Sequence, residues 1–392
     1  MKKIIFISKY ALAPDSGQHS RLFDIANIFS RKKYNVEIIS SISCCYNYDL
    51  NNYKKSILFY WRQYDRVKHI LIKGPKISQG FSLIRIFSWI IFELYLFAIL
   101  LFRKFDYLYI SSLPLFTVIN GYIFKCIKKS PFILEIRDIW PESLIQIGNY
   151  SKKNLFIKFL YFIEKIGYKN AIHIVSPLEN FNKYLDKKKI NYSFFYVPMD
   201  IPKIDVKLSG IINKNRTFNI CYAGSFGYAN GIGEFLRIIS SIDVPDHVKF
   251  TFIGRGQDYN KLKQKYQSEK IIFKPFLPLV KLIDHISNYD MGLHIIPERE
   301  IYNYGISPNK WGTYFLSGLC VLTISELNQT FLTKNKIGYN VKFNKNSISK
   351  FLKENCNISN KTEHKKKSLR AYEIAKKDLN LTNNLTNLIN NL

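Results

Sequence analysis

The sequence predicts an α/β protein of two domains, each built on a parallel sheet with helices on both faces. The chain has 392 residues, which exceeds one ordinary hydrophobic core and suits two domains. Short apolar runs alternate with amphipathic helical segments in both halves, as in repeated βαβ units. Pro198–Arg216 holds Pro, Gly, Lys and Asn with little apolar periodicity, as linkers do. We therefore expect a first domain over residues 1–200, a second over residues 201–370 and a closing C-terminal helix over residues 371–392.

The first domain is expected to begin with a strand at Lys3–Ser8, because its apolar run is typical of a strand buried on both faces. Ser20–Lys32 then repeats apolar residues at helical spacing, and Val36–Ser40 returns as a strand, which completes one βαβ unit. The same alternation predicts further strands at Tyr107–Ser111, Phe132–Ile136, Ala171–Val175 and Phe194–Val197, and helices at Leu115–Lys128 and Asn154–Lys169.

One segment of the first domain raises the question of a membrane. Ile86–Phe102 is apolar over 17 residues except near Glu93, and basic residues flank it at both ends. This length is short for a bilayer span, and a carboxylate at its centre would be costly there. We expect a helix of the α/β domain that is buried or lies in a membrane interface, rather than a span.

The second domain repeats the alternation. Strands are predicted at Phe218–Tyr222, Lys249–Ile253, Ile271–Phe273, Met291–Ile295 and Val321–Ile324, and helices at Gly231–Ser241, Tyr259–Gln267, Leu279–Ser287 and Pro308–Ser317. Ligands bind at the carboxyl ends of such sheets, because loops and helix N-termini converge there. Two such sheets therefore predict a ligand cleft.

Basic residues are in large excess: 58 Lys and Arg stand against 29 Asp and Glu, a net charge of +29. This charge favours anionic partners, and we expect an anionic membrane surface and a pyrophosphate-containing substrate. The Lys residues are spread along the chain and no nucleic-acid-binding motif is present, so we expect no nucleic acid partner. A nucleic-acid binder stays an alternative that rests on charge alone.

The six Cys residues form no C-x-x-C pair and have no metal spacing with His. We therefore expect no metal and no cofactor, in a reducing cytoplasm. The N-terminal apolar run, Ile4–Ile7, is too short for a signal peptide and continues as the first strand.

Glycine-containing turns follow three of the predicted strands. Gly17 lies after the first strand, Gly224, Ser225 and Gly227 follow the first strand of the second domain, and Gly254 and Arg255 follow its second strand. Glycine lets the backbone approach a bound group, and the next helix offers unpaired N–H groups to phosphate. None of the turns is a G-x-G-x-x-G motif, so together they favour a nucleotide other than a nicotinamide cofactor.

A helix start is predicted at Ser307-Pro308-Asn309-Lys310. Ser307 is a good N-cap and Pro308 a good first helical residue. Lys310 would then lie in the first turn, where the helix dipole disfavours a cation. A pyrophosphate docked at the helix start would explain a Lys at this position. The alternative is an ordinary capped helix with a solvated Lys.

A predicted strand ends in the charged cluster Arg137, Asp138, Trp140 and Glu142. Charges at the carboxyl end of a strand suit the orientation of sugar hydroxyls or of an acceptor. The alternative is a salt bridge of Arg137 with Asp138 or Glu142 that fixes the loop.

These stretches resemble family 4 of the retaining glycosyltransferases, which has the GT-B fold of two Rossmann-like domains facing across a cleft. The sequence is most similar to the subgroup of O-antigen and capsule enzymes that includes fucosaminyl- and fucosyltransferase-like proteins. The resemblance covers residues 1 to about 325. Its most specific stretches are LEIRDIWPES and GISPNK, and it extends through PDSGQHSRLFDIANIF, YLYISSLPLF, AIHIVSPLENF, NICYAGSFGYANGIGEFL and FTFIGRGQDYNKLK.

The resemblance implies site residues by position. Gly17, Gly224, Ser225, Gly227, Ser307, Asn309 and Lys310 would bind the donor diphosphate, and Gly254 and Arg255 the base and ribose. Asp138, Arg137 and His19 would be catalytic or orienting residues at the reacting sugar, and Trp140 and Glu142 acceptor-binding residues.

The sequence also departs from the family. The broader family has two Glu separated by seven residues, and those positions are Gly305 and Thr313 here. Glu298 and Glu300, a few residues upstream, are candidates to replace them.

The resemblance implies a retaining, metal-independent transfer from a nucleotide-sugar, with UDP expected, to a lipid-linked saccharide acceptor in O-antigen, lipopolysaccharide or capsule synthesis. The expected location is the inner face of the bacterial cytoplasmic membrane, with the protein attached peripherally. A sugar-nucleotide epimerase of the same fold and a non-catalytic sugar-nucleotide-binding relative are the alternatives.

Overall fold

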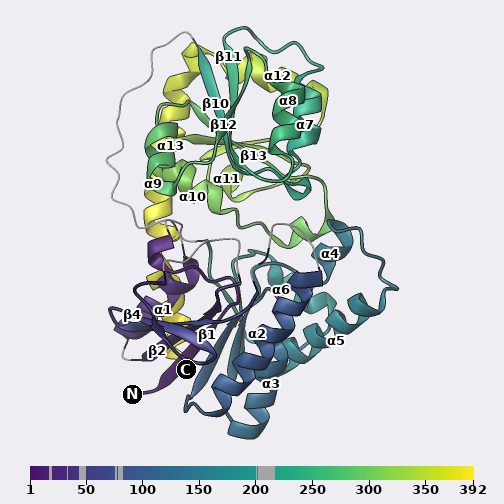
Figure 1. Ribbon diagram of the computed structural model, residues 1–392. Helices are drawn as coiled ribbons and strands as arrows, with labels where there is room; N and C mark the ends of the chain where they lie inside the picture. Colours follow the sequence, from purple (N-terminus) through teal and green to yellow (C-terminus); the bar gives the residue numbers. More distant parts are fainter. Residues whose placement is uncertain are drawn as a thin grey trace. The chain divides into compact units, whose positions relative to one another are not determined.

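The structure is a computed structural model that describes residues 1–16, 20–32, 34–43, 50–75, 77, 83–199, 201 and 217–392 (Figure 1). Its contacts divide the chain into two units. The first contains Met1–Pro198, Tyr304–Ser307 and Leu381–Leu392, and the second contains Met199–Asn303 and Pro308–Asn380.

The sheet of the first unit has nine strands in the described residues, and it is parallel except at one edge. Strand β4 runs antiparallel to both of its neighbours, β3 and β5. The parallel strands from β5 onward follow the doubly wound order, with the switch point between β1 and β6. The sheet order is β3 (Lys54–Lys55), β4 (Phe59–Tyr64), β5 (Val67–Ile72), β2 (Asn35–Ser41), β1 (Lys3–Ile7), β6 (Tyr107–Ser111), β7 (Phe132–Glu135), β8 (His173–Ser176) and β9 (Phe194–Tyr196).

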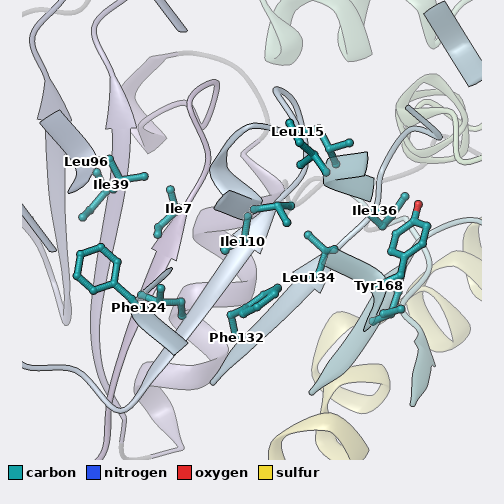
Figure 2. Packing of buried hydrophobic residues seen from close by; sticks show 14 of the residues in the cluster. Ile7, Ile39, Leu96, Ile110, Leu115, Phe124, Phe132, Leu134, Ile136 and Tyr168 are labelled. Carbon is teal, nitrogen blue, oxygen red and sulfur yellow. The ribbon is translucent and has the colours of Figure 1, made fainter. Parts of the chain in front are cut away.

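Helices cover both faces of this sheet, as expected when strands are apolar on both sides. Side chains of α1 (Arg21–Arg31) and α14 (Leu381–Asn390) form one core with the first face. The core on the other face has side chains from α2 (Leu83–Leu101), α3 (Thr117–Lys128), α5 (Leu155–Asn170) and α6 (Phe181–Lys187); the short helix α4 (Glu142–Gln146) lies between β7 and α5 in the chain. Figure 2 shows part of this second core, with labelled side chains Ile7, Ile39, Leu96, Ile110, Leu115, Phe124, Phe132, Leu134, Ile136 and Tyr168.

A buried ion pair ties α1 to the carboxyl edge of the first sheet. Arg21 Nε donates to Glu135 Oε1 at 2.9 Å, and both side chains are buried. The remaining guanidinium nitrogens donate to the carbonyl oxygens of Val197 and Pro198, at the end of the unit's first segment. Removing one member of such a pair would leave a buried charge without its partner, which costs free energy. The pair therefore holds α1 at the end of β7.

The strand prediction was incomplete at one edge of the first sheet. The antiparallel strand β4 and its neighbours were not predicted, because the sequence of β4, FYWRQY, joins four aromatic residues to Arg and Gln without a regular alternation. Its residues are half-buried or exposed, as is usual near the edge of a sheet, and pairing with β5 stabilises them.

The second unit has a fully parallel sheet in the order β12 (Ile271–Pro275), β11 (Val248–Arg255), β10 (Phe218–Ser225), β13 (Met291–Ile295), β14 (Cys320–Ile324) and β15 (Gly338–Val341). This is the order of a dinucleotide-binding sheet, and the switch point lies between β10 and β13. The helices of this unit are α7 (Ile232–Ile239), α8 (Tyr259–Tyr266), α9 (Leu279–Ile286), α10 (Asn309–Leu316), α11 (Phe331–Lys334), α12 (Lys345–Asn355) and α13 (Lys361–Asp378). The predicted α/β class is therefore confirmed for both sheets.

Candidate functional site

Two glycine turns pack backbone against backbone at the carboxyl edge of the second sheet. Gly254 has φ +154°, and a Cβ atom there would lie 1.8 Å from the carbonyl oxygen of Gly224. Gly256 has φ +155°, and its Cβ would lie 2.2 Å from the carbonyl oxygen of Phe226. Side chains are excluded at both positions, so the backbone of the two turns can pack closely there.

The Lys310 ammonium group lies beside the β10 turn. A Cβ on Gly224 would be 3.5 Å from Lys310 Nζ. This nitrogen donates to the Tyr222 hydroxyl at 3.4 Å and lies 4.4 Å from the centre of the Tyr222 ring. No carboxylate among the described residues pairs with Lys310, and burial lowers its pKa to about 7. The edge therefore carries a poorly solvated cationic group that an anion would stabilise.

Lys310 lies in the first turn of helix α10, which begins one residue later than the predicted start at Pro308. The helix is Asn309–Leu316, its N-cap residue is Pro308, and no side chain caps it. The N-cap prediction for Ser307 was wrong, because Pro308 has the extended ψ of 113° and the helical backbone starts after it. Lys310 is in the first turn, as predicted, and Asn309 is exposed. The first N–H groups of the helix add partial positive charge.

Two buried residues that the sequence did not single out support this edge. The Tyr314 hydroxyl accepts from the Ala223 amide and donates to the Leu293 carbonyl, each at 2.9 Å, so it joins β10 to β13. The His294 ring contacts Trp311 edge-on, 5.6 Å between centres. Burial, and then the charge of Lys310, lower the pKa of His294. A single Tyr in an apolar helix and a single His in an apolar strand give no signal in the sequence for such roles.

The other predicted donor residues of the second unit vary in their surroundings. Ser225 is exposed, and its hydroxyl accepts from the Asn230 side chain at 3.1 Å. Gly227 has open space where a Cβ would be, so its neighbours do not require glycine. The Arg255 guanidinium lies 4.2 Å from the centre of the Phe276 ring. The structure thus brings Gly224, Gly254 and Lys310 together most closely.

In the first unit, Asp138 is held by its own loop. Its carboxylate accepts from the Ser143 hydroxyl. Burial raises the pKa of Asp138, and hydrogen bonds from Ser143, the Ile139 amide and Trp140 oppose the rise. Arg137 is exposed, and the alternative salt bridges to Asp138 and Glu142 do not form in the described part of the chain, where these carboxylates accept from Ser143 and Tyr161. The guanidinium is therefore available to a ligand.

The two predicted acceptor residues have different partners. The Trp140 ring packs edge-on against Trp89, 6.1 Å between centres. The Glu142 carboxylate accepts from the Tyr161 hydroxyl of α5 at 2.8 Å. Trp140 also hydrogen-bonds to Asp138, whereas Glu142 bonds to a side chain of α5.

Some predicted positions lie elsewhere. Gly17 and His19 fall outside the described residues. A Cβ at Gly305, which has φ +113°, would lie 2.5 Å from the Glu179 amide, so a glutamate has no room there. Thr313, the second position of the family's Glu pair, is buried. Glu298 and Glu300 are exposed on the second unit.

The similarity of this chain to known proteins lies in its three-dimensional structure. No family model and no curated protein matches the sequence. The sucrose-phosphate synthase of Thermosynechococcus elongatus matches at a TM-score of 0.73 and 10% identity, covering 100% of this chain and 99% of that one. HepE of Anabaena, solved with UDP and glucose, matches at 0.67 and 12%, with the same coverage. The lipopolysaccharide outer core galactosyltransferase WaaB matches at 0.61 and 12%, covering both chains fully.

The chain has the GT-B fold. The matches extend over both units, so the doubly wound order of each sheet is the order of a two-domain GT-B protein. At these identities the likeness establishes the fold, and the chemistry must come from the residues of this chain.

Proposed function

We propose that the protein is a retaining glycosyltransferase that moves a sugar from a nucleotide-sugar, expected to be UDP-linked, to a lipid-linked saccharide. The pathway would be O-antigen, lipopolysaccharide or capsule synthesis. The protein would act at the cytoplasmic face of a bacterial membrane. The fold supports the donor class, because HepE, which shares it, was solved with UDP and glucose.

The observation that carries the proposal is the Lys310 ammonium group at the N-terminus of α10 and beside the glycine turn of β10, which pairs with no carboxylate of the described residues. A leaving nucleoside diphosphate develops negative charge as the sugar bond breaks. An ammonium group and helix amide groups that are already oriented stabilise this charge without reorganisation. We propose that they do so without a metal ion.

The proposed stereochemistry follows from the same leaving group. The acceptor hydroxyl would attack from the face that the diphosphate leaves, and the departing phosphate oxygen would take the hydroxyl proton. No strong base is then needed in the enzyme. Arg137 and Asp138 of the first unit are proposed to orient the sugar or the acceptor, since Arg137 is exposed beside the constrained Asp138 loop.

The test is the Lys310→Ala variant. Removal of this charge is expected to lower kcat on the order of 10²- to 10³-fold, as loss of one transition-state donor does. Release of UDP from UDP-sugars would be measured in the presence of membrane-extracted lipid-linked saccharides. Lys281→Ala, at an exposed lysine of α9, is the matched control. An unchanged rate in the Lys310→Ala protein rejects the assignment.

The missing Glu pair favours one rival function, a sugar-nucleotide-binding protein without turnover. Neither Gly305 nor Thr313 offers a carboxylate, and Gly305 has no room for one. Tight UDP binding by the parent chain, with no sugar transfer to any acceptor in the same extract, would select the rival. Conversion of the donor sugar to an isomer would instead select an epimerase.

A further inference from the structure

Helix α2 exposes large apolar side chains along one side. Phe87, Ile90 and Leu94 are 58%, 52% and 62% exposed. Their spacing of three and four residues places them on one helical face. The opposite face, which includes Phe92 and Leu96, is buried in the core of the first unit. The helix is long and apolar enough to cross a membrane by length and composition, with 33% of that stretch buried.

Helix α5 adds to this apolar surface. Leu155, Phe159 and Phe162 are exposed on it, at the same helical spacing. Phe116, just before α3, connects the two helices, since its ring lies 5.8 Å from Trp89 of α2 and 6.3 Å from Phe159 of α5. Figure 1 shows α2, α3 and α5 on one side of the first unit's sheet. We name the surface the α2/α5 face, made of Phe87, Ile90, Leu94, Leu155, Phe159 and Phe162.

Most of the exposed charge around the α2/α5 face is positive. Helices α2, α3 and α5 contain two acidic residues, Glu93 and Glu164. Glu93 accepts hydrogen bonds from Thr117 and Asn120, and Glu164 is buried in an ion pair with Lys188. Exposed basic residues, by contrast, occur on these helices and in the loops beside them: Lys104, Lys129, Lys152, Lys153, Lys158 and Lys165.

We propose that the α2/α5 face docks on an anionic lipid bilayer, with α2 in the plane of the interface. An apolar face bordered by lysines matches such a surface, because the apolar side chains enter the headgroup region while the lysines reach the anionic lipids. The helix does not span the bilayer, since its inner face is part of the domain core. A second copy of this chain is a poorer occupant, because both copies would bring the same basic border.

The docking face adjoins the candidate acceptor residues. Trp89 lies between exposed residues of α2 and Trp140, whose loop holds Asp138. A docked first unit therefore keeps this loop close to the lipid surface. Docking requires neither donor nor acceptor, so it is a property separate from the proposed transfer reaction.

The experiment is flotation of the full chain with phosphatidylcholine vesicles that contain or lack phosphatidylglycerol. The parent protein is expected to float with the anionic vesicles. Phe87→Ser/Leu94→Ser/Phe162→Ser should bind these vesicles at least about tenfold more weakly, because each replacement removes inserted apolar area. The matched control is Ile57→Ser/Val280→Ser/Ile358→Ser, at exposed apolar residues outside the face, and it should float like the parent.

Three results would overturn the proposal: equal flotation of the triple variant and the parent, retention of the parent in membranes after alkaline carbonate extraction, and a dimer of the parent in lipid-free buffer that the triple variant loses. Circular dichroism would check folding, and Phe87→Ser alone would replace a triple variant that fails to fold. UDP binding, measured on the same variant, stays unchanged if only docking is lost. The failure of docking and the failure of the proposed function are thus separate results.

Discussion

At the scale of the residue, the Lys310 ammonium group lies in surroundings that hydrate it poorly. Its neighbours are the Tyr222 ring and hydroxyl and the bare backbone at Gly224. The ring offers a cation–π contact, which offsets only part of the lost hydration. A phosphate group beside Nζ would supply the missing counter-charge, so ligand binding and protonation of this lysine must be coupled.

This coupling predicts how UDP binding depends on pH. In the free protein the pKa of Lys310 is about 7, and a bound diphosphate raises it. Binding therefore weakens as the pH rises through and above 7, with the Kd increasing by up to about tenfold per pH unit. Calorimetric titration with UDP at several pH values above 7 would measure this slope.

The control is Lys310→Met, which keeps the length of the side chain but cannot ionise. It should bind UDP weakly, and its Kd should change little over the same pH range. Buffers of different ionisation enthalpy would report proton uptake by the parent near pH 7.5. A parent Kd that does not depend on pH would contradict the coupling.

At the scale of the element, α2 carries a carboxyl group inside an apolar helix. Thr117 Oγ1 donates to Glu93 Oε1 at 2.6 Å, and Asn120 Nδ2 donates to Oε2 at 2.8 Å. Burial nevertheless raises the pKa of Glu93 from 4.5 to about 7. The hydrogen bonds oppose the shift but do not cancel it, so near neutral pH the helix carries a carboxyl group that is partly protonated.

Glu93→Gln should therefore change how stability depends on pH. Since the pKa is higher in the folded state, the parent has its full stability below pH 4.5 and loses about 3 kcal/mol as the pH rises to about 7 and beyond. Gln mimics the neutral acid and avoids this loss. Urea unfolding at pH 5 and pH 8 should show the variant gaining on the parent at pH 8. Equal gains at both pH values would show that charge at Glu93 is not the cause.

Local sequence patterns predicted some helices and strands well and others poorly. The unbroken apolar run at Lys3–Ser8 and the helical spacing at Ser20–Lys32 suffice for β1 and α1, because burial on both faces leaves a strong pattern. Strand β4, next to the edge of the sheet, gave no such pattern, since it depends on pairing with β5. The start of α10 was misplaced because Pro308 fits either the N-cap or the first helical turn.

The sequence predicted the glycine turns of the candidate site but not how they lie relative to one another and to Lys310. Gly after a strand suggests a close approach, but the sequence cannot show that Gly254 packs on the carbonyl of Gly224. It also cannot show that Lys310 lies over Tyr222, 88 residues away in the chain. Such contacts depend on the parallel pairing of β10 with β11 and β13, which is a property of the whole sheet.

At the scale of the whole molecule, the net charge of +29 acts against compactness. Like charges repel in the folded state, and salt screens this repulsion. Added sodium chloride should therefore raise the Tm of the protein in low-salt buffer, by an amount that levels off once the Debye length falls below the typical separation of charges. Scanning fluorimetry across a salt series would measure it. A falling Tm would mean that attractive ion pairs dominate instead.

The division into units has a consequence for how the protein is made. Helix α14 covers one face of the first sheet, with Leu381, Leu385 and Leu388 in the same core as Phe6 and Tyr109. A ribosome reaches this helix only after it has synthesised every residue of the second unit. The first unit is begun first and completed last, so the part of its apolar surface that α14 covers stays exposed in the nascent chain until synthesis ends, although α1 already packs on Phe6.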